Sequence, residues 1–268
     1  MLKDKVVVIT GASSGFGEDS ARLFAQKGCR VVLTARRQER LVQLAKEIQS
    51  QGGRAMAVRL DVSQVSQIDA MVGVVLKEYG RVDILFNNAG FGRLDWLESL
   101  DPIKDIDTQI DVNLRGLIQT TRAVLPCMMD QRSGSIINMS SVAGKMAPPL
   151  FTIYAATKYG VRGFTEALRR EVKPYGIQVS GIYPGGAATE FGQHSGNSEI
   201  KQRVKTPAWL RMTSVYVARK VVALAEHPRR ALVVPWWIES AIWLDAHLPW
   251  LVDLAVSGMV KKYHDKKN

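Results

Sequence analysis

Short apolar segments alternate with helical patterns along the chain, and this alternation constrains the fold more than any other feature. Seven segments have the length and the β-branched, apolar composition of buried strands. They are residues 5–10, 30–35, 55–60, 82–86, 135–139, 177–182 and 231–234. Because alternating strands and helices form parallel β-α-β units, we expect an α/β fold with a doubly wound, mainly parallel seven-stranded sheet and helices on both faces. No Pro-, Gly- or Ser-rich linker divides the 268 residues, so one domain is expected.

A glycine-rich turn follows the first predicted strand. Thr10 precedes Gly11-Ala12-Ser13-Ser14-Gly15-Phe16-Gly17, and a helical pattern begins at once. Such a turn lets the backbone approach a pyrophosphate, whose charge is met by N–H groups at the helix N-terminus. The spacing G-x-x-x-G-x-G departs from the usual G-x-G-x-x-G, so the turn alone is a weak indication of a Rossmann-like cofactor site. Its expected cofactor contacts are Gly11, Ser13, Ser14, Gly15, Phe16 and Gly17.

Tyr154 and Lys158 are four residues apart in a helical pattern, so both side chains would project from one face of a helix. A phenol has an ordinary pKa of about 10 and needs a positive neighbour that favours the phenolate. Lys158 would supply that charge. Ser141 lies thirteen residues before Tyr154, where its hydroxyl is suited to bind an oxygen on which negative charge develops. The three residues predict reduction of a carbonyl, with the hydride coming from a cofactor.

Further motifs follow one another in a fixed order. They are Asp61-Val62, Asn87-Asn88-Ala89-Gly90, Asn113 within Asp-Val-Asn-Leu, and Pro184-Gly185 with Thr189. Taken singly, Asp61 suits a helix cap and the asparagine motif suits a turn. Together with the glycine turn, Ser141, Tyr154 and Lys158, however, they resemble the short-chain dehydrogenase/reductase family over about residues 3–235.

The resemblance implies a role for each motif. Ser141, Tyr154 and Lys158 are expected to be catalytic together with Asn113, whose counterpart in the family interrupts a helix and holds a water that connects the lysine to solvent. The other expected cofactor contacts are Asp61, Val62, Asn88, Ala89, Gly90, Pro184, Gly185 and Thr189, joined by Tyr154 and Lys158 themselves.

Arg36 and Arg37 follow the second predicted strand, where an NAD-specific enzyme usually has an acidic side chain that binds the ribose hydroxyls. Two guanidinium groups instead favour the 2′-phosphate of NADP, which arginine binds through charge-assisted hydrogen bonds. Ser13 or Ser14 would add a hydroxyl contact. The sequence therefore predicts NADP(H) as cofactor; the alternative is that both arginines merely solvate a loop.

The implied activity is an NADP(H)-dependent oxidoreductase that transfers hydride between the nicotinamide and a carbonyl or alcohol substrate. During reduction Tyr154 would donate a proton to the substrate oxygen, which Ser141 would stabilise. Lys158 would hold the ribose hydroxyls and, with the positively charged oxidised nicotinamide, lower the pKa of Tyr154. The alternative is a catalytically silent NADP-binding regulatory protein, which would not need all four catalytic groups.

Residues 186–212 combine a polar stretch at 194–198 with the apolar pair Trp209-Leu210, which predicts a lid over the substrate. Apolar side chains expected near the site favour an apolar ketone, aldehyde or alcohol, although each also suits an ordinary core position. They are Phe91, Met146, Phe151, Phe191 and Trp209.

Residues 236–268 form a tryptophan-rich extension of the 1–235 core. Asp253, Ser257 and Lys261 recur every four residues, so an amphipathic helix is expected from about 250 to 262. The segment is too short and too interrupted by charges to span a bilayer. We favour packing of this helix over the substrate pocket or onto a partner subunit; the other interpretation is peripheral contact with a membrane, with the lysine tail on anionic headgroups.

The net charge is +11, from 36 Lys and Arg against 25 Asp and Glu. Such an excess attracts nucleic acid or anionic membranes, but a nucleic-acid partner would not need the cofactor motifs and is not expected. The four histidines lack metal-ligand spacing, so no metal is expected. Two distant cysteines and a first strand close to residue 1 favour a cytoplasmic protein, membrane-associated only if the extension binds lipid. The resemblance implies a homodimer or homotetramer, paired through helices at about 103–130 and 152–174.

Overall fold

The computed structural model describes residues 2–186 and 211–264, with side chains up to residue 258. Its seven strands form one sheet in the order β3-β2-β1-β4-β5-β6-β7, and each neighbouring pair is parallel. The strands are β1 (Val6–Thr10), β2 (Arg30–Ala35), β3 (Arg54–Arg59), β4 (Ile84–Asn87), β5 (Gly134–Met139), β6 (Ile177–Pro184) and β7 (Ala231–Val234). All seven predicted strands are confirmed, with ends within two residues of the predicted ones.

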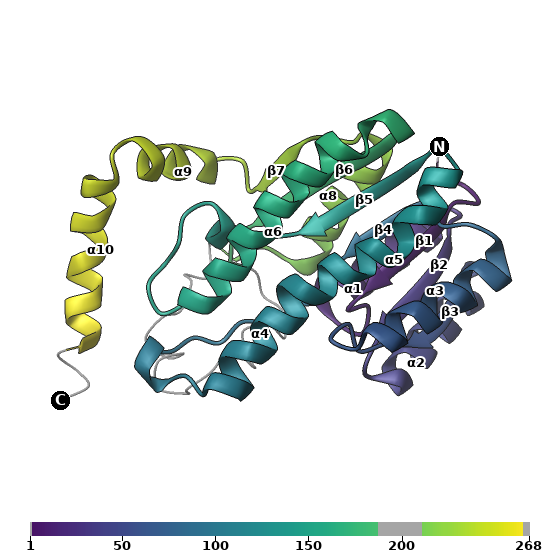
Figure 1. Cartoon of the computed structure of the whole chain (residues 1–268), viewed down its shortest axis with the longest axis horizontal. Helices are drawn as coiled ribbons and strands as arrows, with labels where there is room; N and C mark the ends of the chain where they lie inside the picture. The colour runs from purple at the N-terminus through teal and green to yellow at the C-terminus, as the bar shows by residue number, and fades with distance from the viewer. Residues whose placement is uncertain (1, 187–210, 265–268) are drawn as a thin grey trace.

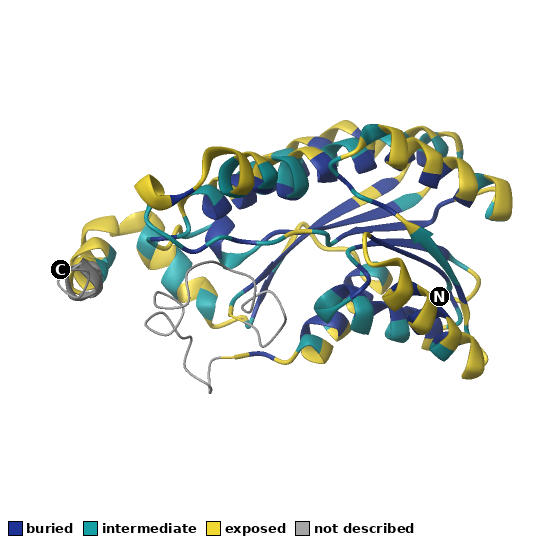
Figure 2. Cartoon of the chain, turned by 90° about the horizontal axis from the view of Figure 1, so that it is seen from below, coloured by how far each residue is buried: buried dark blue, intermediate teal, exposed yellow. Residues whose placement is uncertain are grey.

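Helices cover both faces of the sheet, as Figure 2 shows. One face carries α1 (Gly15–Gln26), α2 (Gln38–Ser50) and α8 (Ser214–Glu226), and the other carries α3 (Val65–Tyr79), α5 (Gly116–Asp130) and α6 (Thr152–Glu171). This arrangement confirms the doubly wound α/β fold.

The central strand β1 explains why the apolar segments are continuous rather than alternating. Val6, Val7, Val8 and Ile9 are all fully buried. Successive side chains of a strand point to opposite faces, so Val7 and Ile9 join the core under α1, α2 and α8, whereas Val6 and Val8 join the core under α3, α5 and α6. A strand buried on both faces needs an apolar residue at every position.

Short helical turns connect the larger elements. They are η1 (Leu97–Ser99), η2 (Pro102–Asp107), α4 (Thr108–Ile110), η3 (Asp111–Arg115), η4 (Val142–Gly144) and η5 (Lys173–Tyr175). Both η2 and η3 are π-helical and run without a break into α5. Asn113 lies within η3, where the sequence predicts an interrupted helix.

Two helices follow β7, namely α9 (Ile238–His247) and α10 (Pro249–His264). The predicted helix at about 250–262 is therefore present. In Figures 1 and 2, α10 stands clear of the sheet and its covering helices. No helix in the described part of the chain is long and apolar enough to cross a membrane.

The order of the strands positions the functional site. β1 pairs with β2 on one side and with β4 on the other, so successive strands are added in opposite directions from β1. Open α/β sheets bind ligands at the carboxyl ends of the strands near such a switch point. Most of the predicted site residues directly follow β1, β2, β4, β5 and β6, and therefore lie at this edge.

Candidate active site

The glycine turn packs tightly between β1 and α1. Gly11 and Gly15 have φ angles of +68° and +57°, which glycine adopts without the strain that other residues incur. A Cβ added at Gly17 would lie 2.4 Å from the carbonyl oxygen of Gly11. The first turn of α1 thus begins directly against the backbone of the loop, leaving its N–H groups at the carboxyl edge of the sheet.

Asn88 holds this turn to the end of β4. Its Nδ2 donates to the carbonyl oxygens of Thr10 and Gly11, each at 3.1 Å. In return, the hydroxyl oxygen of Thr10 accepts from the backbone N–H groups of Asn88 at 2.9 Å and Ala89 at 3.0 Å. The structure thus brings two predicted cofactor motifs together. Sequence reasoning did not single out Thr10 as a contributor, although its position immediately before the glycines was a usable signal.

Arg37 lies against the same turn. Its Nε donates to Ser13 Oγ at 3.0 Å, and its Nη2 donates to Ser14 Oγ at 2.7 Å and to the carbonyl oxygen of Ser13 at 3.3 Å. β2 ends in Ala35, and Arg36 is exposed. The end of β2 therefore presents guanidinium groups beside the glycine turn, with no acidic side chain from Thr34 to Arg37.

Asp61 and Val62 follow β3. Asp61 Oδ1 accepts from the backbone N–H and the hydroxyl of Ser63 at 3.0 and 2.8 Å, so its carboxylate orders the turn before α3. Val62 is buried, and its carbonyl oxygen would lie 2.7 Å from a Cβ added at Gly116. Val62 therefore lies against the start of α5.

Ser141 and Tyr154 meet near the ends of β5 and β6. Ser141 Oγ lies 3.4 Å from the carbonyl oxygen of Pro184 and accepts from the backbone N–H of Ala143 at 3.1 Å. Ser141 also hydrogen-bonds the phenol of Tyr154. Burial raises the pKa of Tyr154 to about 12, while the bond from Ser141 acts in the lowering direction. The Pro184-Gly185 turn is thus beside the predicted catalytic pair.

Lys158 is buried one helical turn beyond Tyr154. Its Nζ donates to the carbonyl oxygen of Met139 at 3.0 Å and lies 5.5 Å from the centre of the Tyr154 ring. Burial lowers the pKa of Lys158 to about 8. The hydroxyl of Ser140 donates to the backbone carbonyl of Lys158 at 3.0 Å, fixing this turn of α6 against β5. Because burial dominates both pKa values, the lowering of the Tyr154 pKa by Lys158 is not seen here and stays a prediction for the cofactor-bound protein.

Asn113 connects the cofactor motifs to the catalytic pair. Its Oδ1 accepts from the Phe91 N–H at 2.9 Å, and its Nδ2 donates to the Phe91 carbonyl at 2.7 Å and to Thr157 Oγ1 at 3.3 Å. A Cβ added at Gly90 would lie 3.0 Å from Asn113 Oδ1 and 3.4 Å from Lys158 Nζ. Only glycine fits here without displacing these groups, so Gly90 is where the cofactor loop meets the catalytic residues.

The apolar residues predicted near the substrate are placed in part. Phe151 packs against Tyr154 with ring centres 5.7 Å apart. Phe91 is held by Asn113, and Met146 is half-buried after the Ser141 turn. Phe191 and Trp209 lie outside the described residues, as do Thr189 and nearly all of the lid predicted at 186–212.

A buried polar network beneath the site was missed by sequence reasoning. Asn87 Nδ2 donates to Asn138 Oδ1 and Thr121 Oγ1, both at 2.9 Å, and Asn138 Nδ2 donates to Thr165 Oγ1 at 3.0 Å. All four side chains are buried. A polar residue near the end of each of two buried strands indicated a buried polar contact. A single sequence does not show which strands pair, so the contact between the two residues could not be predicted.

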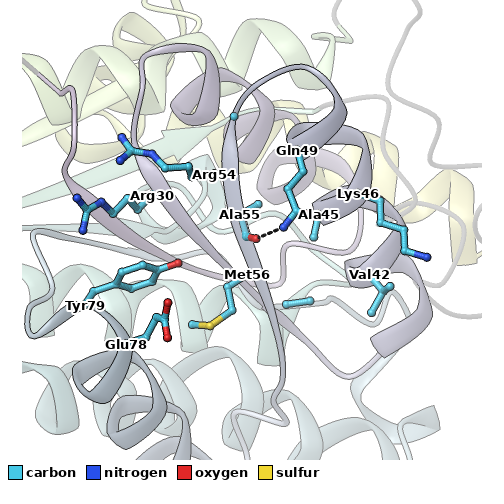
Figure 3. Close-up of a pocket in the computed structure, with 12 residues that line it drawn as sticks. Arg30, Val42, Ala45, Lys46, Gln49, Arg54, Ala55, Met56, Glu78 and Tyr79 are labelled. Atoms are coloured by element: carbon cyan, nitrogen blue, oxygen red, sulfur yellow. Dashed lines mark hydrogen bonds between the residues drawn. The ribbon is translucent and has the colours of Figure 1, made fainter.

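A surface groove lies at the opposite end of the strands. It runs between α2, β3 and the end of α3, where Arg30 lies over the Tyr79 ring and Gln49 donates to the carbonyl of Ala55 at 2.9 Å (Figure 3). Arg30 and Arg54 begin their strands. None of the predicted site residues lines this groove, so it is separate from the candidate active site.

The residues at the carboxyl edge fit a nicotinamide dinucleotide. The glycine turn and the N-terminus of α1 present backbone N–H groups to a pyrophosphate, and the absence of a side chain at Gly90 lets the loop after β4 lie close to Asn113 and Lys158. Among the residues described, no group of three or more His, Cys, Asp or Glu side chains is placed to hold a metal ion. The fold and site define a dinucleotide-binding α/β protein with a buried tyrosine–lysine pair.

Comparison with known proteins agrees with this class. The short chain dehydrogenase family pattern matches residues 5–200. An uncharacterized oxidoreductase of Staphylococcus saprophyticus is 38% identical over 206 residues, which cover 76% of this chain and 82% of that protein. The chain belongs to the short chain dehydrogenase family, and it is an oxidoreductase of that type.

Two solved structures have the same fold. A short chain dehydrogenase/reductase from Burkholderia phymatum, in complex with NAD, superposes with a TM-score of 0.82 at 26% identity, covering 96% of both chains. An alcohol dehydrogenase from the archaeon Thermococcus sibiricus, complexed with 5-hydroxy-NADP, superposes with a TM-score of 0.76 at 29% identity, covering 87% of this chain and 95% of that one.

Proposed function

We propose that the protein is an NADP(H)-dependent oxidoreductase that interconverts a carbonyl and an alcohol. The observation that supports this most directly is the contact around Gly90, where the cofactor loop, Asn113 and Lys158 come within van der Waals reach. When bound, the reduced nicotinamide supplies the hydride. The chain's own residues supply the proton, orient the reacting groups and stabilise charge.

Tyr154 is the proton donor and acceptor in this proposal. With a pKa of about 12 in the cofactor-free protein, the phenol carries its proton at neutral pH and is ready to donate it to a carbonyl oxygen. In the opposite direction the phenolate is needed, and Lys158 together with a positively charged nicotinamide would favour it. Ser141 bonds the phenol and would also bond the substrate oxygen.

Lys158 and Asn113 have supporting roles. The bond from Lys158 to the Met139 carbonyl fixes the ammonium where it would hold the ribose hydroxyls. Asn113 would carry a water that connects Lys158 to solvent, and its bonds to Phe91 and Thr157 hold it in place. Thr189 would bind the nicotinamide carboxamide.

Arg37 supports the preference for NADP(H). The two similar structures contain NAD in one case and an NADP derivative in the other, so the residues at the end of β2 must decide. Arg37 is seated against Ser13 and Ser14, and these three side chains would converge on a 2′-phosphate. Arg36 would add charge from the exposed side.

The substrate is proposed to be an apolar ketone, aldehyde or alcohol. Phe151 beside Tyr154, together with Phe91 and Met146, would form the apolar wall. A homodimer or homotetramer would form through α5 and α6, where Tyr159 is 39% exposed on the outer face of α6. We propose a cytoplasmic location.

The first experiment compares NADPH with NADH on a panel of aldehydes, ketones and alcohols, following nicotinamide absorbance. Wild type should prefer NADPH. Arg37→Ala should reduce that preference roughly 10- to 100-fold, because a charge-assisted hydrogen bond contributes about 1.5–3 kcal/mol. Arg40→Ala, three residues further along on exposed α2, is the matched control and should keep the preference. An NADH preference in wild type would refute the cofactor assignment.

The second experiment separates an enzyme from a silent regulator. Tyr154→Phe keeps the ring and loses the hydroxyl, so turnover should fall at least about 100-fold while NADPH binding persists. Retained turnover would refute the acid-base assignment. NADPH binding by wild type with no turnover on any substrate would favour the regulator.

A further inference from the structure

The C-terminal extension, residues 236–264, exposes apolar side chains that a folded chain usually buries. Half of the exposed large apolar side chains in the described part of the molecule fall between residues 236 and 254. Trp236 is 78% exposed, Trp243 57%, Trp250 63% and Leu254 72%. No residue of α9 is buried. A concentration of this kind marks a contact surface rather than scattered exposure.

Among the described residues, the extension contacts the rest of the chain mainly near its start, where a Cβ added at Gly185 would lie 2.8 Å from Ile238 Cδ1. α9 packs against β7, and α10 packs mainly against α9. Figure 1 shows α10 at one side of the molecule, apart from the sheet. Packing of this helix over the substrate pocket or onto a partner subunit therefore stays a prediction.

Charge and aromatic content indicate what covers the surface. Lys261 and Lys262 lie in the last turn of α10, and Lys266 and Lys267 follow in the sequence. Residues 236–268 hold four carboxylates, of which Glu239, Asp245 and Asp253 precede the lysines and Asp265 lies among them, and the whole chain carries a net charge of +11. Basic residues next to exposed tryptophan and leucine are complementary to anionic headgroups over an acyl layer.

The tryptophans favour a membrane interface over a purely apolar partner. Its ring is apolar while its N–H needs a polar partner, so it concentrates at the boundary between headgroups and acyl chains. Four of the six tryptophans lie in the extension. Since α10 does not have the length or composition to cross a bilayer, it would lie along the surface.

We propose that α9 and α10 seat the protein on a membrane surface that contains anionic lipids. Trp243, Trp250 and Leu254 enter the headgroup region, and the basic C-terminal sequence adds electrostatic attraction to anionic lipid. The proposal does not depend on the cofactor or the substrate, because none of the candidate active-site residues lies in the extension.

Co-sedimentation of the full chain with phosphatidylcholine vesicles, with and without phosphatidylglycerol, tests the proposal. Wild type should bind the anionic vesicles, with a blue shift of tryptophan fluorescence, and bind at least about tenfold more weakly to phosphatidylcholine alone. Trp250→Ser with Leu254→Ser should weaken binding at least about tenfold. The matched control is Val74→Ser, which changes an exposed apolar residue of α3 (45% exposed) and should bind like wild type.

A second variant tests the charge. Lys261→Glu with Lys262→Glu should remove the preference for phosphatidylglycerol. Sedimentation velocity without lipid measures the competing occupant, a second copy of the chain. If wild type ignores both kinds of vesicle, or if the Trp250/Leu254 variant dissociates an oligomer and changes no lipid binding, the proposal is overturned.

Discussion

The carboxyl edge of the sheet buries polar side chains, whereas the C-terminal extension exposes apolar ones. At the edge, polar groups such as Asn113, Asn138 and Lys158 are buried, and each has its hydrogen bonds within the chain. In the extension, apolar groups such as Trp250 and Leu254 are exposed and have no cover within the described chain. Among the described residues, the first region therefore pairs most of its buried polar groups, whereas the second leaves apolar side chains in water.

The largest effect is expected at Gly17, which packs closely against the backbone of the glycine turn. Gly17→Ala would place a Cβ 2.4 Å from the Gly11 carbonyl oxygen, which should cost about 3 kcal/mol of unfolding free energy. NADPH affinity should fall roughly 100-fold because the N–H groups of the turn move. Fluorescence titration and chemical denaturation measure both quantities.

Gly73→Ala is the matched control, since nothing lies within 4 Å of a Cβ on this exposed glycine of α3. It should stabilise the protein by roughly 0.5–1 kcal/mol. If Gly17→Ala and Gly73→Ala changed stability and NADPH affinity equally, the glycine turn would have room for a side chain at residue 17.

The charge of Lys158 predicts a pH dependence of stability. Burial lowers its pKa from 10.5 to about 8, so between these pH values the unfolded chain holds a proton that the folded chain lacks. The contribution of Lys158 to stability therefore rises with pH across this window, and the cost of burying the charged form is fully present below pH 8. For a shift of this size the change is at most about 3 kcal/mol.

Denaturation of wild type and Lys158→Met from pH 7 to 10.5 isolates this contribution. The advantage of the methionine variant should shrink as pH rises. Cys29 and Tyr183, whose pKa values burial raises to about 12, titrate in both proteins and cancel in the difference. Tyr154 lies beside Lys158 and its pKa is also raised to about 12, so the comparison is made in a Tyr154→Phe background. A difference that is constant with pH would place the lysine in a more hydrated environment.

Asn113→Ala should have a moderate effect. It removes the partners of the Phe91 N–H and carbonyl and should cost about 1–3 kcal/mol of unfolding free energy. We also expect kcat to fall roughly tenfold if Asn113 carries a proton-relay water. Thr157→Ser keeps the hydroxyl that Asn113 contacts and should leave kcat within a factor of about two. Unchanged kcat in Asn113→Ala would leave the residue a purely structural role.

The smallest effect on folding is expected in the extension. Trp250→Ser with Leu254→Ser should change the unfolding free energy by less than about 1 kcal/mol, because both side chains are already in water. Phe86→Ala, which empties a fully buried position in β4, should cost about 3–5 kcal/mol. A large loss in the extension variant, measured by denaturation in buffer without lipid, would show that these residues are buried in solution.

Most of the fold could be predicted from sequence because parallel strands buried on both faces leave continuous apolar segments, as in Val6–Thr10. The strand order needed more than periodicity and was not predicted; it is known from the structure. The glycine turn, Ser141, Tyr154 and Lys158 could be placed near one another because each follows or faces a strand end. Their pKa values could not, since burial, which has no local signature, is the largest cause of the shift at Tyr154 and the cause of the shift at Lys158.

Residues that act through long-range partners escaped prediction. Thr10 and Thr157 look like ordinary strand and helix residues until Asn88 and Asn113 are placed against them. The orientation of the extension likewise depends on contacts outside a single helix. The regular spacing of Asp253 and Ser257 predicts a helix there but does not indicate which surface covers it.

The paired asparagines beneath the site also bear on how the sheet assembles. Asn87 and Asn138 are direct register partners of β4 and β5, and their amides bond each other and two threonines. Sliding one strand by a single residue would turn its asparagine to the opposite face and bury amides without partners. The paired asparagines therefore favour the observed register over one shifted by a single residue, and this register sets where Asn88 and Ser141 emerge, just past the ends of β4 and β5.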